Sequence, residues 1–196
     1  AAALACALAL AACGGPQTRV NDVRLGIALE PPNLDPTSGA AAATDEIVYA
    51  NIFEGLTRIG AHGEVLPALA ERWDISPDRL TYIFHLHEGV RFHDGTSCDA
   101  ADVKFSLDRA RAPESTNAQK GLFEPIAAVE IVDPLTVKVT LTRPAGDFLF
   151  NMGWGDAVIV APESAATNAV KPIGTGPFRF SRWLRGTQIE LVCNPD

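Results

Sequence analysis

Histidines are the most concentrated residues in this chain that could perform chemistry, because three of the four lie at positions 85, 87 and 93. Residues two apart in a strand point to the same side, so His85 and His87 could supply two zinc ligands. No third ligand follows at a convincing spacing, and solvated strand positions are the alternative. The sequence contains no Gly-x-Ser-x-Gly, His-Glu-x-x-His or phosphate-binding loop, which argues against the enzymes that those motifs identify.

The acids that follow the histidines are better explained by helix capping than by catalysis. Asp99 is a good N-cap, and Asp102 places a second carboxylate near the positive end of the helix. Val103, Leu107 and Ala110 then fall on one helical face. The sequence therefore predicts an amphipathic helix that begins after Asp99.

A hairpin is predicted just before this helix, over residues 73–87. Ser76, Pro77, Asp78 and Arg79 form a polar turn, in which the proline presets φ for a type I turn. In the second arm, apolar residues alternate with others, which favours a strand with one core-facing side. The apolar positions are Leu80, Tyr82, Phe84 and Leu86.

Composition limits the class of protein. Acidic residues outnumber basic ones by 24 to 16, for a formal charge of −8, so the chain has no electrostatic footprint for nucleic acid or an anionic membrane surface. The 196 residues, 47% of them hydrophobic, can form a sizeable core in one or two domains.

The first residues are predicted to be a targeting segment. Residues 1–12 are an apolar run of the length of a signal-peptide h-region and too short to span a bilayer. Leu10 to Gly14 resembles a bacterial lipobox, in which Cys13 would carry the lipid anchor. An alanine-rich helix with a buried cysteine is the alternative, but Gly14-Gly15-Pro16 would stop it. Of the remaining cysteines, Cys98 and Cys193 could form a disulfide or remain two unpaired thiols.

Further elements are predicted from apolar patterns and turn residues. Thr44 is expected to cap a helix that runs to Phe53, and a second hairpin is expected between residues 56–59 and 65–66. Strands are predicted at residues 23–29, 90–92, 128–132, 136–141, 157–160, 178–183 and 188–193.

The stretch from Pro67 to Ser106 closely resembles the most recognisable segment of the family 5 extracellular solute-binding proteins, the peptide- and nickel-binding lipoproteins of bacterial ABC importers. Arg79, His87 and Cys98 depart from the pattern. Pro172 to Phe178 also resembles the family's P-x-G-T-G-P-F link. The matching residues of the first stretch are Pro67, Leu69, Ala70, Trp73, Ser76, Asp78, Thr81, Tyr82, Phe84, Leu86, Gly89, Val90, Phe92, Asp94, Gly95, Ala101, Asp102, Val103 and Ser106.

The resemblance implies a mixed α/β fold of the type II periplasmic-binding-protein class, comprising part of lobe I with an inserted α+β subdomain. It covers only the amino-terminal part of a family member, so the second lobe is expected to be absent from these residues. The implied divisions are a signal segment and lipobox (1–12), a lipidated linker (13–22), the first segment of lobe I (23–43), the inserted subdomain (44–169) and a truncated return to lobe I (170–196).

The resemblance also directs attention to residues that could line a ligand cleft. Glu30, Pro31 and Asn33 lie in a proline-rich loop after the first predicted strand, where a carboxylate could take a peptide amine; a rigid loop without a ligand is the alternative. Asn117 is a weaker candidate. Trp154 and Asp156 could contact ligand between the lobes, although Trp154 could instead fill the core under a hairpin.

The implied function is that of a lipid-anchored, monomeric binding protein in the periplasm or cell envelope. It would capture a peptide or similar small solute, close around it and deliver it to the permease subunits of an inner-membrane ABC importer, without a cofactor, a metal or enzymatic turnover. The alternatives are a structural or chaperone-like envelope lipoprotein and, less favoured, a secreted hydrolase.

Overall fold

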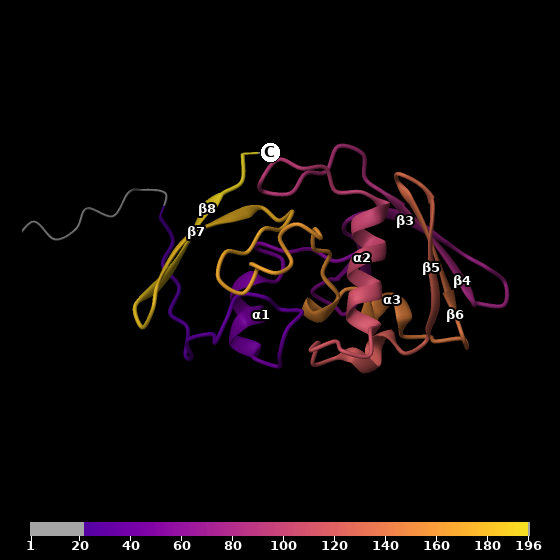
Figure 1. Cartoon of the computed structure of the whole chain (residues 1–196), viewed down its shortest axis with the longest axis horizontal. Helices are drawn as coiled ribbons and strands as arrows, with labels where there is room; N and C mark the ends of the chain where they lie inside the picture. Colours follow the sequence, from indigo (N-terminus) through magenta and orange to yellow (C-terminus); the bar gives the residue numbers. More distant parts are fainter. Residues whose placement is uncertain (1–21, 196) are drawn as a thin grey trace, which may run out of the picture.

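The computed structural model describes residues 22–195, so Cys13 and the predicted lipobox lie outside the described residues. Its largest sheet is antiparallel, with strand order β3-β4-β6-β5. Helix α2 packs on β5 and β6 (Figure 1). The bounds are β3 Ala70–Ile75, β4 Thr81–Leu86, α2 Ala100–Arg111, β5 Ile126–Asp133 and β6 Thr136–Leu141.

Helix α2 begins where the sequence predicts. The Asp99 side chain accepts from backbone N–H groups of the first turn, and the Asp102 side chain accepts from the Asp99 N–H at 2.9 Å, which completes a capping box. Val103, Leu107 and Ala110 are buried on the face toward the sheet. The expected N-cap and apolar face are therefore both confirmed.

The alternation in β4 is also confirmed. Tyr82, Phe84 and Leu86 are buried, whereas the residues between them are only partly covered. Tyr82 lies opposite Val139 of β6, and its ring centroid is 4.8 Å from that of Phe148. Pairing on both sides makes β4 a central strand, so its apolar face forms the middle of the main core.

A second core lies beyond α2. It joins α1 (Ala42–Val48) to the hairpin of β7 (Phe178–Leu184) and β8 (Gln188–Cys193), which Figure 1 places at the end away from the large sheet. Short elements link the two regions: β1 (Thr57–Ile59) pairs with β2 (Val65–Pro67), and η1 (Lys120–Phe123), α3 (Phe148–Asn151) and η2 (Gly155–Ala157) follow α2. The division of the chain at residues 44 and 169 stays a prediction.

The glycines of the 172–177 crossover are required by close packing. A Cβ at Gly174 would lie 2.0 Å from the Ile52 carbonyl oxygen, and one at Gly176 would lie 2.5 Å from that of Asn51. His93 fixes the same segment, because its Nδ1 accepts from the Gly174 N–H at 3.3 Å and its Nε2 lies 2.9 Å from the Gly176 carbonyl oxygen. This pattern places the ring proton on Nε2.

Three predicted strands are wrong. Residues 23–29 form no strand, and Val23, Leu25 and Leu29 are 71–84% exposed, because this apolar segment has no hydrogen-bonded neighbour among residues 22–195. Glu30, directly after this segment, accepts a hydrogen bond from Trp183 of the β7–β8 hairpin. Residues 157–160 and 90–92 each form only an isolated bridge, Gly55 with Val158 and Arg91 with Ser97.

The predicted helix from Thr44 to Phe53 is wrong at both ends. Helix α1 has Ala41 at its N-cap, and the Thr44 hydroxyl instead donates to the Asn33 carbonyl at 2.9 Å. The helix ends at Val48 because Ala50 adopts a left-handed φ of 57°. None of the helices within residues 22–195 has the length and apolar character to cross a membrane.

Candidate ligand-binding site

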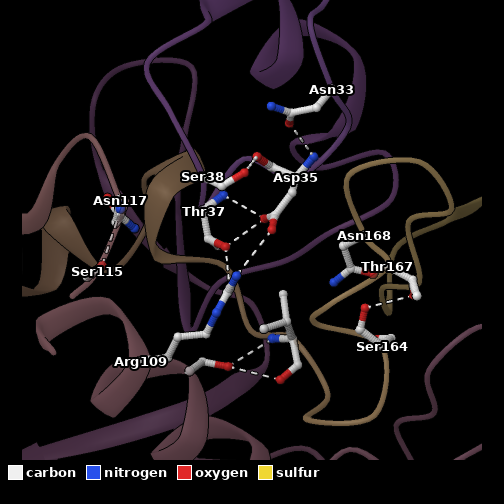
Figure 2. A network of polar contacts seen from close by, with 12 residues as sticks. Asn33, Asp35, Thr37, Ser38, Arg109, Ser115, Asn117, Ser164, Thr167 and Asn168 are labelled. Atoms are coloured by element: carbon white, nitrogen blue, oxygen red, sulfur yellow. Dashed lines mark hydrogen bonds and ion pairs between the residues drawn. The ribbon is translucent and has the colours of Figure 1, made fainter.

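A polar loop of residues 33–38 is fastened to α2 (Figure 2). Asp35 Oδ1 accepts from the Thr37 N–H at 2.9 Å and the Thr37 hydroxyl at 2.6 Å. Arg109 donates to the same hydroxyl at 2.5 Å and pairs with Asp35 Oδ2 at 3.3 Å. Because Asp35 and Thr37 are buried, this network fixes the loop and neutralises Asp35.

Asn117 joins the loop to a second segment. Its Nδ2 donates to the Asp156 carbonyl oxygen at 2.8 Å, and its Oδ1 accepts from the Gln119 N–H at 2.9 Å. The backbone at Gly39 bridges to Asn117 in a parallel sense. Asn117 is itself buried, so it positions the backbone around Asp156.

Trp154 and Asp156 flank Gly155 at the start of η2, and their environments differ. The alternative that Trp154 fills the core is wrong, because the residue is 40% exposed and meets Phe150 edge to face, with ring centroids 6.4 Å apart. Asp156 is only 7% exposed. An accessible indole and a buried carboxylate therefore stand two residues apart.

Asp45 of α1 also belongs to this group, although no motif in the sequence points to it. A Cβ at Gly155 would lie 3.0 Å from Asp45 Cγ and 3.1 Å from Asp45 Oδ1, so the glycine lets the carboxylate approach the chain beside Asp156. Burial raises the pKa of Asp45. Burial, followed by the charge of Asp45, raises the pKa of Asp156 to about 6.

A cavity of about 450 Å³ lies beside Asp156, between α2 and the segments just described. This volume is in the range of small-molecule sites. Its wall is partly apolar and partly polar, and besides Asp156 includes Thr37, Phe105, Arg109, Glu114, Thr116 and Val160.

The proline-rich loop lies partly outside this group. Pro31 is buried, and Asn33 uses Oδ1 to accept from the Asp35 N–H at 2.9 Å. Glu30 reaches the β7–β8 hairpin, where its Oε1 accepts from Trp183 Nε1 at 3.1 Å and from the Gly186 N–H at 2.9 Å. The structure thus joins Asn117 to the backbone of Asp156, two residues after Trp154, and gives Glu30 a contact with the hairpin.

The histidines and cysteines within residues 22–195 do not assemble a metal centre. His85 Nε2 lies 2.8 Å from Asp74 Oδ2, His87 is exposed, and His93 holds the crossover. The residues described contain no group of three His, Cys, Asp or Glu side chains that could hold a metal ion. Cys98 is buried and Cys193 exposed, and both are free thiols, so the disulfide alternative is wrong.

The sequence of this chain matches the family model of the bacterial extracellular solute-binding proteins, family 5 (middle region), over residues 64–196. The chain belongs to this family. Family 5 comprises substrate-binding transport proteins rather than enzymes, and the expected resemblance is confirmed.

Individual relatives agree with this assignment. The chain is 40% identical to a glutathione-binding protein of Pectobacterium atrosepticum, over 77% of this chain and 30% of the relative. It is 34% identical to di/tripeptide-binding protein 4 of Pseudomonas aeruginosa, over 97% of this chain and 41% of the relative.

A solved structure shares the fold. It is an ABC transporter-associated periplasmic binding protein from Helicobacter pylori in complex with the peptide STSA. Its TM-score is 0.73 at 31% identity, with coverage of 84% of this chain and 37% of that one. The chain therefore spans about a third of the length of its relatives, and the periplasmic-binding-protein class predicted for the fold is confirmed.

Proposed function

We propose that the protein containing this chain is the solute-binding component of an ABC importer, which captures a peptide or similar small solute in the periplasm and delivers it to the membrane permease. The observation that carries the proposal is the cavity of about 450 Å³ beside Asp156, whose backbone carbonyl is held by Asn117. The names of the glutathione- and peptide-binding relatives support a ligand of this size and class.

In this proposal the chain supplies one wall of the site. Asn117 and the 33–38 loop are fixed by internal hydrogen bonds, so the wall is preorganised and little conformational entropy is lost when a ligand binds. Trp154 offers an accessible apolar surface. When a second wall closes over the solute, the closed state is favoured over the open state only to the extent that this wall adds contacts with the solute.

Membrane attachment through Cys13 is part of the same proposal. A lipid on Cys13 would keep the protein at the membrane, near the permease, as a monomer. Cys13→Ser in the precursor should abolish lipid labelling and release the protein from the membrane fraction. Unchanged labelling in this variant would refute the anchor and leave solute binding untouched.

The test of solute binding is calorimetric titration of the full-length protein with a set of di- and tripeptides. We expect saturable binding of at least one peptide, with no cleavage of the peptide by mass spectrometry after the titration. Trp154→Ala should weaken that binding at least tenfold, whereas Trp183→Phe, outside the group, should leave it within twofold. Absence of binding to every peptide, or turnover of one, would contradict the proposal.

A further inference from the structure

Strand β5 forms one edge of the large sheet. It pairs with β6 on one side and has no strand on its other side within residues 22–195. The strand is eight residues long and mostly apolar, and Ile131 and Val132 are 47% and 59% exposed. An edge strand of this length and character presents backbone groups with which a strand of another molecule could pair.

The ladder of the sheet shows which residues of β5 face the free edge. On β6, the Leu141 N–H donates to the Leu80 carbonyl oxygen, so Leu141 and every second residue before it, including Val139, direct their backbone groups toward β4. Val129 of β5 lies opposite Val139. Because β6 offers it no backbone bond at this position, Val129 directs its carbonyl group to the free edge, as do the residues two positions away.

Two cations of α2 bond this edge directly. Lys104 Nζ donates to the Val129 carbonyl oxygen at 2.9 Å, and Arg111 Nη1 donates to that of Ala127 at 3.3 Å. Asp108 holds both cations in place, since its Oδ2 pairs with Lys104 at 2.6 Å and its Oδ1 with Arg111 at 2.7 Å. We call Lys104, Asp108 and Arg111 the edge cap.

The edge cap is not needed to attach α2 to the sheet, because an apolar face of the helix is already buried there, through Val103, Leu107 and Ala110. The rest of the edge is interrupted, since the register with β6 shifts between Ile126 and Ala128 and again after Ile131. Such irregularities bend a strand away from an incoming partner. Only residues 130–132 stay open, which is shorter than an ordinary strand.

We propose that the edge cap keeps a second copy of this chain from pairing its own β5 with this edge. A second copy is the partner to exclude, because two identical edge strands can pair antiparallel about a two-fold axis and extend one sheet through both molecules. With the cap in place, the N–H groups of the incoming strand meet carbonyl oxygens that already have donors, beside two positive charges. This inference concerns assembly and is independent of which solute the protein binds.

Sedimentation velocity of the full-length protein at pH 7.5 tests the cap. The triple variant Lys104→Met/Asp108→Asn/Arg111→Met keeps apolar stems on α2 but removes the bonds to the edge. It makes this acidic chain more negative, so weaker charge repulsion cannot cause association. We expect its dissociation constant for self-association to be at least tenfold lower than that of the parent. Lys138→Met is the matched control, because Lys138 pairs with Glu130 on the same sheet, and it should behave like the parent.

Two further measurements locate the contact. Ile131→Lys places a charge on the free edge and should return the triple variant to the self-association of the parent. A fluorescent peptide with the sequence of residues 127–132, AAVEIV, should bind the triple variant at least tenfold more tightly than the parent. If circular dichroism shows that the triple variant is unfolded, Lys104→Met takes its place, because it keeps the pair of Arg111 and Asp108, and its self-association should be at least threefold tighter.

The outcomes are decisive in both directions. Self-association of the folded cap variant that equals that of the parent would overturn the proposal. Association that Ile131→Lys leaves unchanged would also overturn it, because the contact would then lie away from β5.

Discussion

Asp156→Asn should make the protein more stable at neutral pH, even though the residue lies in the candidate ligand site. The folded-state pKa of Asp156 is raised from 3.8 to about 6, so the folded protein holds this proton more tightly than the unfolded chain. The stabilisation linked to that proton is fully present below pH 3.8 and is lost as pH rises through about 6. At neutral pH the charged form therefore destabilises the fold.

The size of the effect follows from the shift. A difference of about two pKa units corresponds to about 3 kcal/mol at 1.36 kcal/mol per unit. Asparagine has nearly the same shape without the charge, so the substitution should recover up to about 3 kcal/mol at pH 7.5. At pH 4.5 the folded carboxyl is already protonated, and the gain should shrink to about 1 kcal/mol.

Urea unfolding at the two pH values measures both numbers, with Asp147→Asn as the control, which should change the free energy of unfolding by less than about 0.5 kcal/mol. A gain that is the same at pH 7.5 and pH 4.5 would show that charge is not its cause. A loss of stability at pH 7.5 would refute the view that Asp156 is an unpaired buried carboxylate.

Two further predictions concern the crossover segment. Gly174→Ala should destabilise the protein by at least about 3 kcal/mol, because its Cβ would lie 2.0 Å from the rigid Ile52 carbonyl oxygen. The control is Gly121→Ala, where nothing lies within 4 Å, and it should change the urea midpoint little. Equal shifts of the urea midpoint in the two variants would contradict this packing. Burial lowers the pKa of His93 in the folded protein. The stability that the neutral ring contributes is therefore fully present above pH 6.5 and is lost as the pH falls toward the lowered pKa of the folded protein. His93→Ala should therefore lower the free energy of unfolding by about 1–3 kcal/mol at pH 7.5 but by less at pH 5. Hydrogen exchange at the Gly174 amide should become faster. If the variant loses the same stability at both pH values, the neutral ring is not the source of the difference.

Elements with local signals could be predicted from the sequence. Helix α2 has its cap, its first-turn acid and its apolar face within twelve consecutive residues, and β4 has strict alternation. The predicted strand at residues 23–29 has the same alternation but no hydrogen-bonded neighbour among the described residues. Strand formation depends on a partner that periodicity does not reveal. The end of α1 depends on the left-handed conformation of Ala50. An alanine in the sequence gives no sign of such a conformation.

The candidate site was only partly predictable for a similar reason. The family resemblance points to Trp154, Asp156 and Asn117, and the structure joins Asn117 to the backbone of Asp156, two residues after Trp154. The sequence does not mark Asp45 as a site residue, because an acid in the first turn of a helix already has an ordinary explanation, the helix dipole. Its nearness to Asp156 depends on the packing of Gly155 against α1. Glu30 shows the opposite outcome. The family resemblance predicts that it faces a ligand, but in the structure its carboxylate accepts a hydrogen bond from Trp183.

A crystal structure of the full-length protein with a bound tripeptide would test the central claim most directly, because it shows whether a solute occupies the cavity beside Asp156. The account predicts that the peptide occupies the cavity beside Asp156 and also contacts Trp154. A peptide bound elsewhere, with the cavity beside Asp156 still empty, would contradict it.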